Sequence, residues 1–181
     1  MPLKRRIFVA ILISPKLQKE IITWENQWQS ASRKMPVRWL AEKNLHLTLI
    51  PPWYEDDIDQ ITKILKTFSG KTVPYEIKFD KVTFGPDPSI PRLIWAEGKT
   101  PPEIINLKSQ LEKILLKQPE KRPFLLHLTL ARFRPEMFSI FPIKKLDESV
   151  SWNDNINSFA LMESHLSPKG AEYSILEKFR F

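Results

Sequence analysis

The order of hydrophobic and polar positions divides the chain into short segments of two kinds. Some are apolar runs or two-residue alternations, which are typical of strands; others repeat apolar residues every three or four positions, as amphipathic helices do. The pattern predicts strands at residues 6–13, 37–40, 45–50, 75–84, 92–96, 125–133, 157–166 and 173–181. It predicts helices at residues 16–30, 55–68 and 101–117, and an irregular loop over the proline-rich residues 135–154.

Strands and helices alternate in this pattern without the regular strand–helix–strand rhythm of a parallel sheet. An α+β fold with antiparallel sheets is therefore expected. The chain has 181 residues, a length that suits one domain or two small lobes around a shared core. Hydrophobic residues make up 42% of it, so a sizeable core is possible, and no stretch has the composition of a linker.

The composition excludes several classes of chemistry. The chain has no cysteine, so disulfides, thiolate metal sites and cysteine nucleophiles are excluded. With 4 glycines, it carries no glycine-rich phosphate loop. The apolar run Ile7–Ile13 follows basic residues but lacks a signal-peptide cleavage site, and no apolar stretch is long enough to cross a membrane. We therefore expect a cytoplasmic protein with no membrane partner.

The positive charge of the chain gives a first indication about partners. A net charge of +7 favours a polyanion such as nucleic acid. Charge alone does not decide, because many basic proteins bind no polyanion. A basic stretch between residues 117 and 134 could follow an RNA backbone or could simply be solvated; its members are Lys117, Lys121, Arg122, Arg132 and Arg134.

One tetrapeptide, His-Leu-Thr-Leu, occurs twice, at residues 46–49 and 127–130. The two copies contain two of the three histidines in the chain. Successive side chains of a strand point to opposite faces, so each histidine shares a face with its threonine, and the two leucines share the other face. Two such strands facing each other would enclose two imidazoles and two hydroxyls, and their leucines would enter the core.

This set of groups suits the hydrolysis of a phosphodiester. In-line attack needs a base to deprotonate water and an acid to protonate the leaving oxygen, and histidine can serve as either near neutral pH. The threonine hydroxyls can donate to the non-bridging oxygens, which carry the charge of the transition state. No metal-binding motif or cluster of carboxylates is present, so we expect neither a metal nor another cofactor.

A purely structural explanation also exists, because a half-buried strand often alternates polar and apolar residues. It would suffice for one copy, but two identical copies that contain two of three histidines favour function. Arg132, five residues after His127, lies on the opposite face of an unbroken strand, whereas a bulge would bring it to the histidine side. His165 follows Ser164, and adjacent strand residues point apart, so these two make a poor catalytic dyad.

The motifs resemble those of the two-histidine (2H) phosphoesterases, and most closely the bacterial and archaeal RNA 2′,3′-cyclic phosphodiesterases, also called 2′-5′ RNA ligases. The resemblance covers nearly the whole chain. Its flanking parts are the opening strand at residues 6–11, the Val-Arg-Trp lead-in at 37–39, the strand at 92–95, and a closing hairpin with Glu163, Ser164, Gly170 and Tyr173. Two departures from the family pattern leave the His and Thr positions intact: Ile-Pro-Pro-Trp at residues 50–53 replaces Phe-Leu-Gly, and Leu126 replaces a common proline. The first lies at the expected cleft mouth and puts substrate preference rather than chemistry in question.

The resemblance carries expectations for fold, site and reaction. It implies that residues 1–181 form a single 2H phosphoesterase domain of two pseudo-symmetric lobes, with two antiparallel sheets, helices on the outside and a central cleft. It implies that His46 and His127 are catalytic and that Thr48, Thr129 and Arg132 bind the phosphate. It further suggests that O3′ leaves and a 2′-phosphate remains, with His46 as the acid and His127 as the base.

The expected partner is RNA that ends in a 2′,3′-cyclic phosphate, and the expected state of the protein is a monomer. Fragments of tRNA and small cyclic nucleotides are alternative forms of this substrate. Two other functions stay open: 2′-5′ RNA ligation, which runs through the same site in reverse, and a non-catalytic module that binds phosphorylated RNA ends. Intact histidines in both copies argue against the module, because binding alone needs no acid–base pair.

Overall fold

The computed structural model describes residues 4–30, 35–167 and 170–181. Its helices are α1 (Pro15–Ser30), α2 (Ile58–Lys66) and α3 (Pro102–Ile114). Its strands are β1 (Arg5–Leu12), β2 (Arg38–Trp39), β3 (His46–Glu55), β4 (Tyr75–Gly85), β5 (Leu93–Glu97), β6 (His127–Arg132), β7 (Asp147–Ile156), β8 (Ser158–Ser167) and β9 (Gly170–Arg180). Two short helical turns lie at Glu42–Asn44 and Pro135–Ile140.

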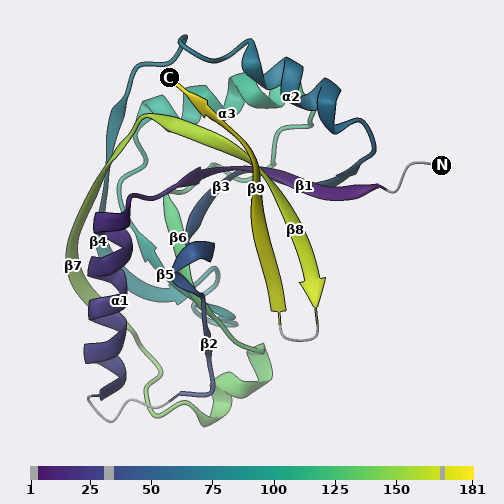
Figure 1. The fold of residues 1–181 in the computed structure, drawn as a ribbon. Helices are drawn as coiled ribbons and strands as arrows, with labels where there is room; N and C mark the ends of the chain where they lie inside the picture. The colour runs from purple at the N-terminus through teal and green to yellow at the C-terminus, as the bar shows by residue number, and fades with distance from the viewer. Residues whose placement is uncertain (1–3, 31–34, 168–169) are drawn as a thin grey trace.

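The strands form two antiparallel sheets, which confirms the expected fold class (Figure 1). One sheet has four strands in the order β3-β1-β8-β9, and the other has five in the order β2-β6-β5-β4-β7. Each His-Leu-Thr-Leu motif begins a strand, β3 in the first sheet and β6 in the second. These two strands contact each other across the boundary between the sheets, which brings the motifs together.

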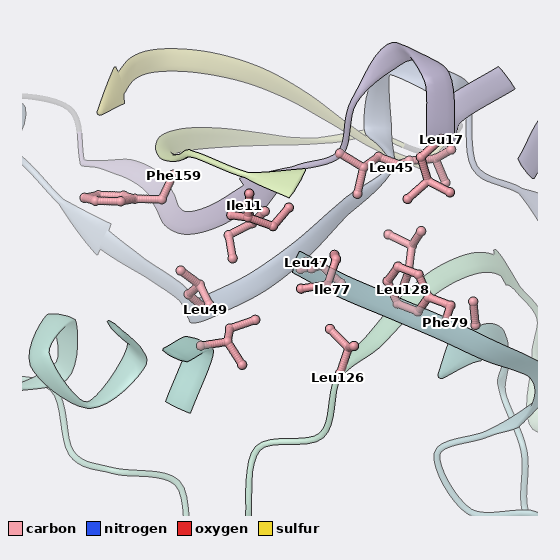
Figure 2. Close-up of a cluster of buried hydrophobic side chains, with 14 of the residues drawn as sticks. Ile11, Leu17, Leu45, Leu47, Leu49, Ile77, Phe79, Leu126, Leu128 and Phe159 are labelled. Carbon is pink, nitrogen blue, oxygen red and sulfur yellow. The ribbon is translucent and has the colours of Figure 1, made fainter. Parts of the chain in front are cut away.

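The leucines of both motifs enter one hydrophobic core. Figure 2 shows Leu47 and Leu49 from β3 in the same cluster as Leu126 and Leu128, which precede and belong to the second motif. All four side chains are at most 1% exposed. Full burial of a leucine stabilises a fold by about 1.5–3 kcal/mol, so these residues fix both strands firmly. The alternation of each strand then turns its histidine and threonine away from the core.

Helices α1 and α3 connect the two sheets by packing across them. Helix α1 follows β1 of the four-stranded sheet but packs on β7 of the five-stranded sheet (Figure 1). Helix α3 follows β5 of the five-stranded sheet but contacts β3 of the other. The N-terminus of α2 is capped by Asp57, whose carboxylate accepts a hydrogen bond of 2.9 Å from the backbone N–H of Gln60. The sheets are therefore held together by helices as well as by the shared core.

The expectation of an irregular loop over residues 135–154 is wrong in its second half. Strand β7 begins at Asp147 and pairs with β4 over most of its length. The interpretation failed because the segment is rich in Ser, Asn and Asp, which are uncommon in strands. A two-residue alternation nevertheless runs through it, with Trp152 and Ile156 buried on the side of the core. As an outer strand, β7 needs an apolar face on one side only.

The boundaries of several elements also differ from the prediction. Strand β3 continues through Pro51 and Pro52 to Glu55, five residues beyond its expected end. Prolines lack the N–H that a central strand needs, but β3 is an outer strand, where they are tolerated. Helices α2 and α3 are shorter than expected at both ends. The predicted closing hairpin is present as β8 and β9, and its turn residues Pro168 and Lys169 lie outside the described residues.

A buried carboxyl on α1 makes stability depend on pH. Glu25 is 4% exposed among the apolar residues of the helix face, and its Oε1 has no hydrogen-bond partner within the described structure. Burial raises the pKa of Glu25 to about 8. Between its ordinary pKa and about pH 8, the folded protein holds a proton that the unfolded chain has lost, so stability falls as pH rises through this range.

Glu25→Gln is therefore expected to stabilise the protein in alkaline solution. Gln keeps the shape of the protonated acid and cannot ionise, so the free energy of unfolding at about pH 9 should rise by about 1–3 kcal/mol, the cost of a buried unsatisfied polar group. At about pH 4, below the ordinary pKa of Glu, this position is mostly neutral in the folded and the unfolded chain of both proteins, and they should differ by less than about 0.5 kcal/mol. Denaturant unfolding at the two pH values measures the difference, and an equal change at both would contradict the prediction.

Candidate active site

The first motif ends in a β-bulge that redirects the strand after it. Along β1, Ala10 pairs with Thr48 and the next residue, Val9, pairs with Ile50, so β3 contains one extra residue here. Leu49 and Ile50 are both buried as a result, and the residue after them returns to the exposed face. That residue is Pro51.

The second motif ends in the same bulge, and here it places a cation. Trp95 of β5 pairs with Thr129, and Ile94 pairs with Ala131, so the extra residue occupies the equivalent position. The bulge carries Arg132 to the face of the histidine, which settles the question of its orientation that the sequence left open. Arg132 occupies in the second motif the position that proline occupies in the first. The two halves of the site match in their histidines and threonines and differ in charge.

Both histidine rings are held by the same hydrogen bond. His46 Nδ1 lies 2.7 Å from the carbonyl oxygen of Asn44, and His127 Nδ1 lies 2.8 Å from the carbonyl oxygen of Leu125. A carbonyl can only accept, so each Nδ1 carries the proton and donates it. Each neutral ring therefore carries its proton on Nδ1, and Nε2 is the nitrogen that can accept or release a proton during a reaction.

Aromatic side chains support both rings from the side. The His46 ring lies 5.1 Å from the Phe8 ring and 4.9 Å from the Tyr173 ring, measured between centroids. The His127 ring lies 4.7 Å from the ring of Trp95, at the same 48° tilt that Phe8 makes with His46. Fixed hydrogen bonds and aromatic neighbours leave little freedom to either imidazole, a requirement for proton transfer along a defined line.

A cavity of about 520 Å³ lies at the first motif and reaches Arg132 at the end of the second. His46, Thr48 and Pro52 line it from β3, and Arg132 lines it from β6. Of the five predicted site residues, His46, Thr48 and Arg132 line this cavity, whereas His127 and Thr129 are not among its lining residues and lie on β6, the strand that contacts β3. Thr129 is half-buried on the same face of β6 as His127.

The environment of His46 favours its neutral form in the free protein. Burial is the main cause and lowers the pKa of His46 to about 4. The hydrogen bond to the Asn44 carbonyl opposes this shift, whereas the positive charges of Arg132 and His127 add to it. An anion bound in the cavity would offset those positive charges and make protonation of His46 easier.

Four residues of the cavity were missed by the sequence interpretation. Arg6 and Phe8 reach it from β1, Arg38 from β2 and Tyr173 from β9. Arg6 Nη1 donates a hydrogen bond of 2.6 Å to Ser164 Oγ, which holds the guanidinium beside the cavity. Their segments resemble parts of the family pattern, but the sequence assigned these residues no role in the site. They lie far apart in the chain, and only the fold brings them to one cavity.

The remaining sequence candidates lie apart from the cavity lining. His165 is exposed, and its Nε2 lies 3.2 Å from Glu163 Oε2. The basic stretch is divided by the fold, because Lys117 lies over the Trp53 ring at 4.2 Å whereas Arg134 borders a neighbouring cavity with Arg132. Within residues 4–30, 35–167 and 170–181, no group of three or more His, Asp or Glu side chains is placed to hold a metal ion. None of the helices in these ranges is long and apolar enough to span a membrane.

The comparisons with known proteins agree on one family. The family model of the 2′-5′ RNA ligase superfamily matches residues 15–167. An RNA 2′,3′-cyclic phosphodiesterase of Archaeoglobus fulgidus is 26% identical over 180 residues, which cover 96% of this chain and 99% of the relative. A protein of the same name from Aquifex aeolicus is 25% identical over 157 residues, or 81% of this chain and 82% of the relative.

Solved structures show the same fold. The crystal structure of E. coli LigT in its apo form has a TM-score of 0.75 at 20% identity, with 98% of both chains covered. Its complex with 3′-AMP gives a TM-score of 0.75 at 21% identity, again over 98% of both chains. At this level of identity, the likeness concerns the arrangement of the two sheets and not the substrate.

Proposed function

Because the chain belongs to the 2′-5′ RNA ligase superfamily, we propose that it hydrolyses the 2′,3′-cyclic phosphate at the end of RNA to a 2′-phosphate. The acid–base pair is His46 and His127, and Thr48, Thr129 and Arg132 bind the phosphate. One observation carries the proposal: both histidines have Nδ1 fixed on a backbone carbonyl, so both offer Nε2 for proton transfer. A module that only binds phosphate has no need of two such matched rings.

The reaction follows from in-line displacement at phosphorus. Water attacks opposite O3′, one imidazole takes its proton, and the other gives a proton to O3′ as the P–O3′ bond breaks. The threonine hydroxyls and the Arg132 guanidinium donate to the non-bridging oxygens, where negative charge accumulates. The product carries one phosphomonoester on O2′ and a free 3′-hydroxyl, so atoms and protons balance without a further reactant.

We assign the acid to His46 and the base to His127, the order that the family resemblance implies. The free protein holds His46 neutral, because burial lowers its pKa to about 4. An acid must be protonated, so this assignment requires His46 to gain its proton together with the anionic substrate. The negative phosphate supplies the driving force, since an opposite charge beside the buried ring favours the imidazolium and also offsets the positive charge of Arg132.

The proposal extends to the organisation and setting of the protein. Residues 1–181 act as a single domain of two pseudo-symmetric lobes, an interpretation supported by the matching bulges of the two motifs and the shared core. The protein works as a cytoplasmic monomer on RNA ends, among them fragments of tRNA. Ligation would use the same groups in the same roles, with a 5′-hydroxyl in place of water as the attacking group: a 2′,5′-phosphodiester forms and O3′ leaves with a proton. In dilute aqueous solution water is the favoured nucleophile.

The activity is tested with an oligonucleotide that ends in a 2′,3′-cyclic phosphate, incubated with the protein in excess chelator. Phosphorus NMR is expected to show conversion to a 2′-phosphomonoester at the same rate with and without chelator, since the protons move between histidines and water. The same oligonucleotide with a 3′-hydroxyl end serves as the control and should stay intact. A predominant 3′-phosphate would refute the assigned geometry, and activity that chelator abolishes and metal restores would refute the mechanism.

A further inference from the structure

One peptide group links the histidine of the second motif to a threonine on another segment. The carbonyl oxygen of Leu125 accepts the hydrogen bond of 2.8 Å from His127 Nδ1. The N–H of the same peptide group belongs to Leu126, and it donates a hydrogen bond of 2.8 Å to Thr100 Oγ1. Two hydrogen bonds in series therefore connect the Thr100 hydroxyl, the peptide group and the imidazole ring.

Thr100 lies where the pairing of β5 and β6 ends. The N–H of Gly98 donates to the carbonyl oxygen of Leu126 at 3.4 Å. In a regular antiparallel ladder, the N–H of Leu126 would donate back to the carbonyl of Gly98, but here it donates to the Thr100 hydroxyl. Thr100 is followed by Pro101 and Pro102, which lead into α3, and a residue before proline favours an extended backbone. The hydroxyl that accepts from Leu126 is therefore attached to a restrained part of the chain.

The peptide group behind the first histidine is held differently. His46 Nδ1 donates to the carbonyl oxygen of Asn44, and the N–H of that peptide group, which belongs to Leu45, donates to the backbone carbonyl of Glu42 at 3.2 Å. This support comes from the backbone, whereas the peptide group behind His127 relies on the hydroxyl of one side chain. A substitution can therefore remove the support of one ring and leave that of the other in place.

Leu126 creates the need for this acceptor. It stands where the family pattern often has proline, which carries no N–H and restrains the backbone through its own ring. The Leu126 side chain is 1% exposed and lies in the core cluster of Figure 2, which fixes one side of the residue. Its N–H still needs a partner, because an unpaired buried donor is costly. The Thr100 hydroxyl supplies that partner in this chain.

We propose that Thr100 is a positioning residue for His127 and acts on it through the peptide group between Leu125 and Leu126. The inference rests on the proposed function, in which His127 takes the proton of the attacking water. A neutral ring with its proton on Nε2 cannot accept another proton there, so the base must keep its proton on Nδ1. By accepting from the peptide N–H, Thr100 polarises the carbonyl that holds Nδ1 and fixes its direction. Thr100 is not among the residues that line the catalytic cavity.

Thr100→Val keeps the shape of the side chain and removes the acceptor. With the cyclic-phosphate oligonucleotide, kcat should fall about tenfold, as is usual when a functional histidine loses an outer hydrogen bond, while KM stays the same. Thr100→Ser keeps the hydroxyl and should restore kcat. Thr23→Val is the matched control: it removes a hydroxyl that bonds to the Lys19 carbonyl on α1, and it should leave kcat unchanged.

Nitrogen-15 NMR of the histidine rings distinguishes positioning from a general loss of stability. In alkaline solution, where imidazole is neutral, the protonated Nδ1 and the unprotonated Nε2 of each wild-type ring should give well-separated resonances. In Thr100→Val the two resonances of His127 should move towards each other, because the Nε2–H form gains population, and Thr100→Ser should reverse the change. Those of His46 should stay in place. An unchanged His127 ring, or equal changes at both rings, would overturn the proposal.

Failure of the proposed function gives a different result. The wild-type protein would then open no cyclic-phosphate end, and the NMR comparison of the two rings would decide on Thr100 by itself. Turnover by the wild type with an unchanged kcat in Thr100→Val would refute the positioning role and leave the chemistry intact. Denaturant unfolding establishes that each variant is folded. Should Thr100→Val not fold, Thr100→Ala takes its place with the same expectations, since it also removes the acceptor.

Discussion

Replacing His127 by alanine is expected to lower the turnover of a 2′,3′-cyclic phosphate end by about 10³-fold, and replacing His46 should have a similar effect. Each variant removes one of two proton transfers. The double variant should be little slower than either single one, because groups that act as a unit lose their effect together. Single-turnover kinetics with each variant, combined with denaturant unfolding, separates loss of chemistry from loss of fold.

The control and the assignment of roles use the same assay. His165→Ala should be close to wild type, because this histidine is exposed and pairs with Glu163 instead of lining the cavity. A substrate whose leaving group needs no proton should restore activity to His46→Ala and not to His127→Ala. The opposite pattern would exchange acid and base, and near-normal turnover in either single variant would disprove the two-histidine mechanism.

Arg132→Ala is expected to reduce kcat by about 10²-fold, the usual cost of removing one preorganised donor to a developing negative charge. The guanidinium reaches the cavity from the five-stranded sheet, while the first motif offers only Pro51 at the equivalent position. Of the two motifs, only the second therefore supplies a cation to the phosphate. Steady-state kinetics on the cyclic-phosphate oligonucleotide measures the loss.

A further variant and a second readout show whether Arg132 acts on the substrate or only on the fold. Arg132→Lys should recover part of kcat, because it keeps the charge but loses the planar donor pair. The pKa of His46 is a second readout: removal of a neighbouring positive charge should raise it, and NMR titration of the ring can follow the change. A loss of activity with an unchanged His46 titration and no recovery in Arg132→Lys would contradict a role in the cavity.

The sequence predicted the fold class because most strands carry their own signal. The motif strands alternate leucine with polar residues, and β1 and β5 are compact apolar runs, so local pattern and tertiary environment agree. Strand β7 was missed because its polar side chains are favourable on an outer strand, and only pairing with β4 makes it extended. Helix ends were predicted too long, since periodicity continues past the residue where capping ends the helix.

The sequence predicted the site residues within the two repeated motifs, but it did not predict the β-bulges at which the motifs end. The positions of His46 and His127 follow from alternation along one strand. The orientation of Arg132 depends on one extra residue of β6 opposite β5. Such a bulge is a property of how two strands pair, so it cannot be predicted from the sequence of β6 alone. Arg38 and Tyr173 enter through the meeting of distant segments, so their place in the cavity could not be derived without the fold.

Strand β3 is an edge strand of its sheet, and this position affects contacts between copies of the protein. An outer strand offers free N–H and C=O groups to any other extended chain, which makes it a starting point for aggregation. Pro51 and Pro52 are both exposed and supply no N–H, so this stretch of the border cannot take up a regular ladder with a second strand. Two of the residues that depart from the family pattern thus leave this stretch without the N–H groups that an added strand would need.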